Sequence, residues 1–114
     1  MKGLIVKPYW ADKILYEGKT VEVRGSNTSI RGEIGIIKSG SKHIYGTVNL
    51  YDCMPIGKEE FEGLLRHYHK IDMSYEELLK IYPKPHAWFL KDVKIFETPI
   101  PYGHKRGCVI WVNL

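Results

Sequence analysis

The sequence contains 114 residues, of which 44% are hydrophobic and 26% are charged, and it carries a formal net charge of +4. This length accommodates one domain around one core, and apolar residues spread along the whole chain exclude a disordered protein. No apolar segment approaches the roughly 20 residues that cross a bilayer, and the first residues are charged too early for a secretory signal. We therefore expect a single cytoplasmic domain over residues 1–114 without a membrane partner, in which Cys53 and Cys108 stay reduced.

The positive charge is concentrated toward the two ends of the chain. Residues 1–42 contain eight Lys or Arg against four acidic residues, residues 43–82 contain four against seven, and residues 83–114 contain five against two. If the ends fold together, a basic face lies opposite an acidic middle segment. Such a face suits a polyanion such as RNA or DNA, although lysines that only solvate the surface give the same composition.

The first half of the chain predicts one helix among short strands. Pro8 is favourable in the first turn of a helix, apolar residues then recur at helical spacing, and Gly18 is a natural stop. Apolar and charged residues alternate after it, with Glu22 and Arg24 on one face of a strand. We expect a helix over residues 8–17 and strands over 4–6, 20–24, 33–38 and 44–51.

Two helical segments and two further strands are expected in the second half. Residues 58–69 place apolar side chains at helical spacing, and Ser74 followed by Glu77 is typical of a capping box. The second helix should end near Tyr82 because Pro83 follows, and strands should cover residues 87–96 and 108–112. This order is not that of a doubly wound sheet. We predict an α+β fold, a small twisted, mostly antiparallel β-barrel flanked by helices.

The helix after Lys7 and Pro8 leads into a charged motif, Gly18-Lys19-Thr20-x-Glu22-x-Arg24. This motif resembles the GxKxxExR-type hallmark of the ASCH domain family, with the glycine one residue closer to the lysine. Further motifs follow in the family's order: Arg31 to Ile36, Gly46 to Cys53, Ala87 to Leu90, Pro99-x-Pro101, Lys105-x-Gly107 and Trp111. The resemblance implies a PUA-like fold and an RNA-associated module with a cleft lined by the charged motif residues. It also implies that some small relatives are enzymes, which act on N4-acetylcytidine or cleave RNA.

The three charged motif residues carry the expected binding chemistry. Lys19 is a compact cation for a phosphate, and Arg24 offers a planar fork that can grip a phosphate or a base edge with two hydrogen bonds. Glu22 can orient these cations or accept a hydrogen bond from a base amine. Without the resemblance, the same residues would be interpreted as ion pairs on an exposed strand face.

Other residues are expected to extend this basic cleft. Trp10 and Tyr82 flank basic residues and are candidates for stacking on a base, with core packing as the alternative. The expected nucleic-acid-binding set is completed by Lys7, Ser26, Asn27, Lys84, His86 and Lys105. We expect the partner to be RNA, another nucleic acid or a nucleotide-like ligand.

Catalysis is the second hypothesis. A small hydrolase would use Lys19 and Glu22, but the amidohydrolase members imply a threonine where this chain has Glu22 and an acid near Ile71. Binding therefore ranks above hydrolysis of a modified nucleoside or of RNA, and a protein-interaction module that uses the acidic helices ranks third. No cofactor is expected, and no metal, because His67 and His69 would point apart on a helix.

Overall fold

The computed structural model describes residues 1–114 and contains one mixed, six-stranded sheet with helices packed on it. In chain order the elements are β1 (Lys2–Val6), α1 (Pro8–Tyr16), β2 (Val21–Arg24), β3 (Gly32–Lys38), β4 (His43–Pro55), the π-helical turn η1 (Glu60–Leu64), α2 (Arg66–His69), α3 (Tyr75–Ile81), β5 (His86–Pro101) and β6 (Trp111–Asn113). The predicted α+β class is therefore confirmed.

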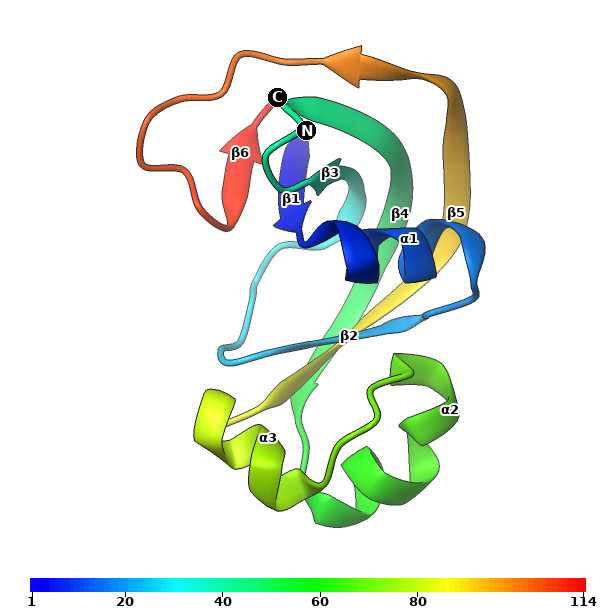
Figure 1. Ribbon diagram of the computed structural model, residues 1–114, viewed down its shortest axis with the longest axis vertical. Coiled ribbons are helices and arrows are strands. Elements are labelled where there is room, and N and C mark those ends of the chain that lie inside the picture. Colours follow the sequence, from blue (N-terminus) through cyan, green and yellow to red (C-terminus); the bar gives the residue numbers. More distant parts are fainter.

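The sheet curls into a half-barrel (Figure 1). Its strand order is β2-β5-β4-β3-β1-β6, so β2 and β6 are the two edge strands. β1 runs parallel to β3, and the other four neighbouring pairs are antiparallel, which confirms a mostly antiparallel sheet. β4 and β5 are the longest strands, with 13 and 16 residues, and their pairing shifts register at three points, which lets the sheet bend.

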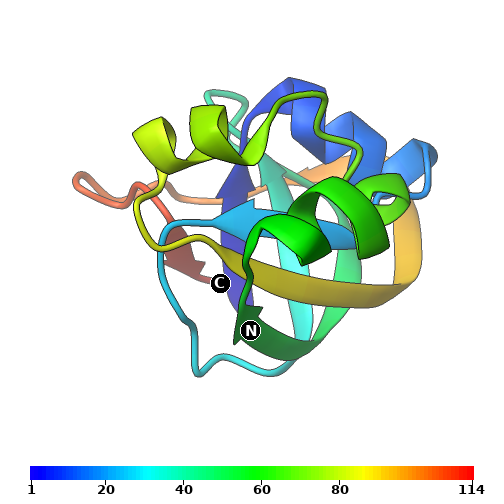
Figure 2. The same cartoon turned by 90° about the horizontal axis from the view of Figure 1, so that it is seen from below.

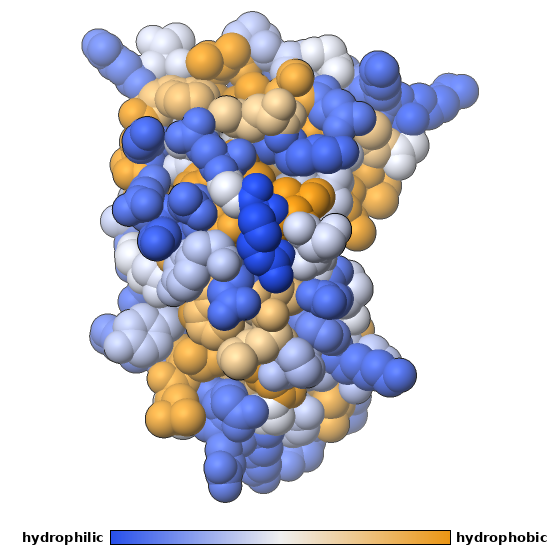
Figure 3. Space-filling model, turned by 180° about the vertical axis from the view of Figure 1, so that it is seen from behind, coloured by the Kyte–Doolittle hydropathy of each residue, from blue (hydrophilic) through white to orange (hydrophobic).

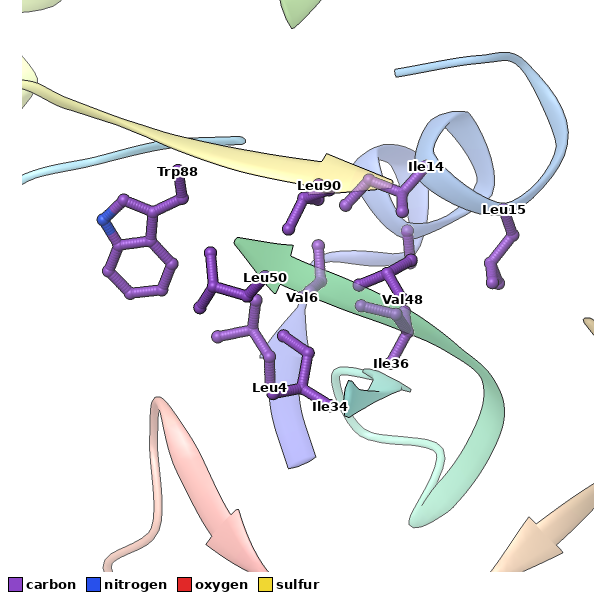
Figure 4. Close-up of a cluster of buried hydrophobic side chains, with 11 residues drawn as sticks. Leu4, Val6, Ile14, Leu15, Ile34, Ile36, Val48, Leu50, Trp88 and Leu90 are labelled. Carbon is purple, nitrogen blue, oxygen red and sulfur yellow. The ribbon is translucent and has the colours of Figure 1, made fainter. Parts of the chain in front are cut away.

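α1 packs against this curved sheet. Pro8 begins the helix, and Gly18 lies just past its end with a φ of +73°, as the sequence predicts. Ala11, Ile14 and Leu15 are buried in an 11-residue cluster with side chains from β1, β3, β4 and β5 (Figure 4). Apolar side chains at helical spacing on α1 therefore form one side of this core, and alternate side chains of the strands form the other.

The segment between β4 and β5 forms a helical layer at one end of the molecule, beyond β2 (Figures 1 and 2). Phe61 and Leu78 from this layer are buried in a second cluster with Val21 and Val23 of β2 and Ala87 of β5. β2 therefore lies between two cores. The longest helix of the protein has nine residues, and none is long and apolar enough to cross a membrane.

The helix predicted over residues 58–69 is interrupted. Its first part is π-helical, because the Leu65 amide donates to the Glu60 carbonyl, five residues earlier, at 2.8 Å. α2 then ends at His69, and the next residue, Lys70, adopts a left-handed φ of +58°. The capping box before α3 is confirmed, since the Glu77 amide donates to Ser74 Oγ and the Ser74 amide donates to Glu77 Oε1, both at 3.1 Å.

The last two strands differ from the prediction because pairing with distant strands decides their length. β5 continues to Pro101 instead of ending at residue 96, since it stays paired with β4 as far as His43. β6 covers only Trp111–Asn113, because only these residues pair with β1. Cys53 and Cys108 are free, half-buried thiols.

Substitution of Gly46 tests how closely β4 approaches β5. A methyl group at this position would overlap the Lys94 carbonyl oxygen and lie 3.0 Å from Leu15 Cδ2. We expect Gly46→Ala to lower the free energy of unfolding in urea by about 1–3 kcal/mol, the range typical of overpacking. Gly63→Ala is the matched control, because nothing lies within 4 Å of that position and stability should stay the same or rise. Equal stability of Gly46→Ala and the wild type would contradict this packing.

Candidate functional site

A cleft of about 340 Å³ opens beside the edge strand β2. Ten of its 14 lining residues are hydrophobic, and they come chiefly from the end of β1, the start of α1, β2, α3 and the segment that precedes α3. Seen from behind, the molecule narrows between the sheet and its helical end, where apolar residues reach the surface among hydrophilic ones (Figure 3). A mostly apolar cleft of this size with a few polar groups is typical of a small-ligand site.

Glu22 and Arg24 form an ion pair in this cleft. Both side chains lie on the face of β2 that Trp88 shares, because Glu22 and Trp88 are direct partners across β2 and β5. Arg24 Nε donates to Glu22 Oε2 at 3.0 Å, and Nη2 lies 2.9 Å from the same oxygen. Nη2 also donates to the Ile5 carbonyl at 3.1 Å, so Arg24 bridges β2 and β1. Nη1 forms no hydrogen bond, and its N–H groups are available to a ligand.

Lys19 lies behind the cleft and does not line it. Only 1% of the residue is exposed, and its Nζ lies 4.7 Å from the centroid of the Trp10 ring. Nζ donates to the His69 carbonyl at 2.5 Å and lies 3.7 Å from Glu22 Oε1. Burial lowers the pKa of the Lys19 ammonium to about 8, although the Glu22 carboxylate opposes this shift. Lys19 therefore influences a bound ligand only through the groups that it contacts.

The His69 imidazole holds in place the backbone that accepts from Lys19. The ring is buried and stacks on Phe61, with 4.4 Å between the ring centroids. Nε2 donates to the Phe61 carbonyl at 2.6 Å and Nδ1 accepts from the Ile71 amide at 2.9 Å, an arrangement that requires the neutral tautomer. Burial lowers the pKa of His69 to about 4, although the bond to Phe61 opposes this shift. Both ring nitrogens are occupied, and no three His, Cys, Asp or Glu side chains form a metal-binding group.

The two predicted stacking residues, Trp10 and Tyr82, both line the cleft and are half-buried. Tyr82 packs directly on Gly25, where a Cβ atom would lie only 2.8 Å from the ring. A glycine directly after the charged motif therefore allows this tyrosine to approach β2. Of the predicted site residues, the cleft brings together Lys7, Trp10, Glu22, Arg24 and Tyr82.

The remaining predicted binding residues lie outside the cleft. The Ser26 carbonyl accepts from the Trp88 indole at 2.9 Å, and Asn27 Oδ1 accepts from the next backbone amide at 2.8 Å, so both residues stabilise the loop. Three further predicted residues do not line the cleft: Lys84, His86 and Lys105. The expected row of basic residues is thus not observed, because Lys7 and Arg24 are the only Lys or Arg side chains that line the cleft.

Sequence reasoning missed most of the apolar wall. Ile71 and Met73 line the cleft, and Arg66 holds them by donating to both of their backbone carbonyls, at 2.9 Å for Met73. Ser39 and Val109 reach the cleft from turns that are distant in the sequence. No local pattern marks these residues as neighbours, because only the tertiary structure brings their segments together.

The fold and the cleft define a class of small α+β domains with a half-barrel sheet and a ligand-sized site at one of its edges. The family model of the ASCH domain matches residues 4–100, and the chain therefore belongs to the ASCH domain family. The resemblance seen in the sequence motifs is thus confirmed. None of the curated proteins compared with the sequence matches it.

Solved structures of an ASCH protein from Zymomonas mobilis share the fold. One matches with a TM-score of 0.67 at 20% identity and covers 88% of this chain and 72% of the other. A serine-to-alanine variant matches with a TM-score of 0.71 at 20% identity and covers 99% and 87%. A tyrosine-to-phenylalanine variant matches with a TM-score of 0.61 at 21% identity and covers 88% and 74%. At these identities the likeness concerns the fold alone.

The lowered pKa of His69 predicts an acid-sensitive fold. The unfolded chain binds a proton on this residue below about pH 6.5, whereas the folded protein binds it only near pH 4. The free energy of unfolding should therefore fall as the pH drops from 6.5 to 4, by about 3 kcal/mol for this residue. His69→Asn should lack this part of the pH dependence, and His67→Asn, which changes an exposed neighbour, should keep it. Protonation of His69 near pH 6.5 in an NMR titration would contradict this assignment.

The lowered pKa of Lys19 predicts how the free energy of unfolding changes at alkaline pH. Its folded-state pKa of about 8 lies below the ordinary value of 10.5, so the unfolded chain holds the proton more tightly. The free energy of unfolding should therefore rise between pH 8 and 10.5, by about 3 kcal/mol for this residue. Lys19→Met should lack this rise in denaturant titrations, and Lys80→Met, at an exposed lysine, should retain it. The same alkaline profile in Lys19→Met and the wild type would show that Lys19 titrates normally.

Proposed function

We propose that the protein binds single-stranded RNA by holding one unstacked base in the cleft. ASCH domains are generally thought to bind RNA, and the chain belongs to this family. A net charge of +4 and an isoelectric point of about 9.0 favour a polyanionic partner. Single-stranded RNA presents bases that can stack on aromatic rings and form hydrogen bonds at their edges.

The observation that carries the proposal is the Glu22–Arg24 pair in a cleft that Trp10 and Tyr82 also line. The carboxylate is an acceptor and the free Nη1 group is a donor, and base edges carry both kinds of partner. Arg24 is already held by the Ile5 carbonyl, so little side-chain freedom is lost when a ligand binds. The apolar walls limit access of water and strengthen these hydrogen bonds.

Hydrolysis of a modified nucleoside or of RNA is the second candidate function. The observation in its favour is the lowered pKa of Lys19, because perturbed pKa values are frequent among catalytic groups. The Lys19 ammonium is buried and does not line the cleft, however, so it cannot contact a ligand bound there. Glu22 is the only carboxylate that lines the cleft. Binding therefore accounts for more of the observed geometry than hydrolysis.

Tyr82 provides the test of the binding proposal. Tyr82→Ala should weaken the binding of a fluorescein-labelled single-stranded RNA, measured by anisotropy, by about tenfold, since stacking on an aromatic ring contributes roughly 1–3 kcal/mol per base. Tyr82→Phe should bind like the wild type, because the ring remains and the Tyr82 hydroxyl forms no hydrogen bond in the structure. Binding should also weaken as salt rises from about 50 to 200 mM.

The control for Tyr82→Ala is Tyr68→Ala, which removes an exposed tyrosine outside the cleft. Thermal unfolding should show that both variants are folded. Undiminished RNA affinity of a folded Tyr82→Ala protein would refute base stacking in this cleft. Gel analysis of the RNA after incubation tests the second function. Shortened RNA after incubation with the Tyr68→Ala protein, but not after incubation with the Glu22→Gln protein, would favour hydrolysis.

A further inference from the structure

A second hollow of about 310 Å³ adjoins the cleft. The two share three lining residues, Ile5, Ser39 and Val109, so they lie next to each other. The second hollow extends from there to the turn between β3 and β4 and to the segment that follows β5. A ligand that fills the cleft therefore has a neighbouring space into which a further group can extend.

Half of the residues that line this second hollow are hydrophobic, and none of them is a carboxylate. Lys42 lines it, and its ammonium takes part in no ion pair. His104 lines it as well, and its Nδ1 lies 2.9 Å from the Tyr102 hydroxyl. A neutral ring that accepts from Tyr102 carries its proton on Nε2, which has no partner in the protein. Two residues that each carry a donor without a protein partner thus line a hollow free of negative charge.

The turn that carries Lys42 is held firmly. Ser41 Oγ donates to the Lys38 carbonyl at 2.7 Å and accepts from the His43 amide at 3.1 Å. The Tyr102 amide donates to the Lys42 carbonyl at 3.2 Å, which ties the turn to the end of β5. Lys42 itself has a φ of +56°, a conformation that costs a non-glycine residue of order 1 kcal/mol. A lysine therefore occupies a position that glycine or asparagine would occupy with less strain.

We propose that this second hollow binds the phosphate group attached to the nucleoside whose base occupies the cleft. This inference rests on the proposed function, and it adds a site for the part of the ligand that lies next to the base. Lys42 supplies the charge, and the free N–H of His104 supplies a directional hydrogen bond. The phosphate can belong to a free nucleotide or to the backbone of an RNA strand, since the two share the same anionic oxygens.

A third hollow is less favourable for an anion than the second hollow beside Lys42. That hollow is lined by Glu62, Asp72 and Glu77 with a single arginine, Arg66. Arg66 already donates to the backbone carbonyls of the segment before α3, and three carboxylates would repel a phosphate. The hollow beside Lys42 contains an unpaired cation and no acid, so it is the electrostatically favourable site next to the cleft.

The test compares ligands with and without phosphate on charge-removing variants. The probes are the four ribonucleosides, their 5′-monophosphates and a mixed-sequence ribohexamer, each titrated by calorimetry or anisotropy. Lys42→Gln should weaken binding of the hexamer by about fivefold or more and lower its salt slope by about one. Affinity for the nucleosides should stay within twofold of the wild type. His104→Gln should weaken the same phosphate-bearing ligands. Lys80→Gln, at an exposed lysine outside both hollows, is the matched control.

The outcomes separate this inference from the proposed function. One outcome would overturn the phosphate site and leave the base site standing. In that outcome Arg24→Gln loses hexamer binding, whereas Lys42→Gln lowers the affinity for the hexamer no more than the control Lys80→Gln does. Unchanged hexamer binding in both Arg24→Gln and Lys42→Gln would overturn both proposals. If Lys42→Gln weakens the hexamer and the monophosphates, the site takes a terminal phosphate. If it weakens the hexamer alone, the site takes an internucleotide phosphate.

Discussion

The buried ammonium of Lys19 is the constraint on which the site depends. A charge removed from water needs partners close by, and here three elements supply them: the His69 carbonyl at the end of α2, the Glu22 carboxylate of β2 and the Trp10 ring of α1. Arg24 shares the same carboxylate and continues to the Ile5 carbonyl of β1. One chain of charges and hydrogen bonds therefore connects the helical layer, the edge strand β2 and β1, and its exposed part lies in the cleft.

The same chain explains why a cleft exists at this place. β2 is an edge strand and pairs only with β5, so no backbone ladder joins β2 to β1. The Arg24 side chain bridges the two strands instead. A bridge made by one side chain leaves space on its outer side, which α3 and Val109 border with apolar groups. The result is a polar floor between apolar walls, an arrangement suited to a ligand that has both a flat face and a hydrogen-bonding edge.

The helical layer between β4 and β5 supports the cleft in two ways. His69 anchors the backbone that accepts from Lys19, through bonds to Phe61 and Ile71. Arg66 holds the carbonyl groups of the segment that lines the cleft. The motif of the edge strand thus works with a segment about 50 residues later in the chain. Substitutions in this layer are expected to alter the cleft even though few of its polar groups face a ligand.

The sequence by itself determined the features that depend on residues close in the chain. Pro8 and Gly18 delimit α1, Ser74 and Glu77 cap α3, and the alternation around Glu22 and Arg24 places both on one strand face, because each signal acts within a turn or a strand. The tertiary structure alone decided that Lys19 is buried, that Lys84, His86 and Lys105 lie outside the cleft and that β5 extends to Pro101. These outcomes depend on contacts such as that between Lys19 and His69, 50 positions apart, and no local pattern encodes the exposure of a charged side chain once distant segments pack around it.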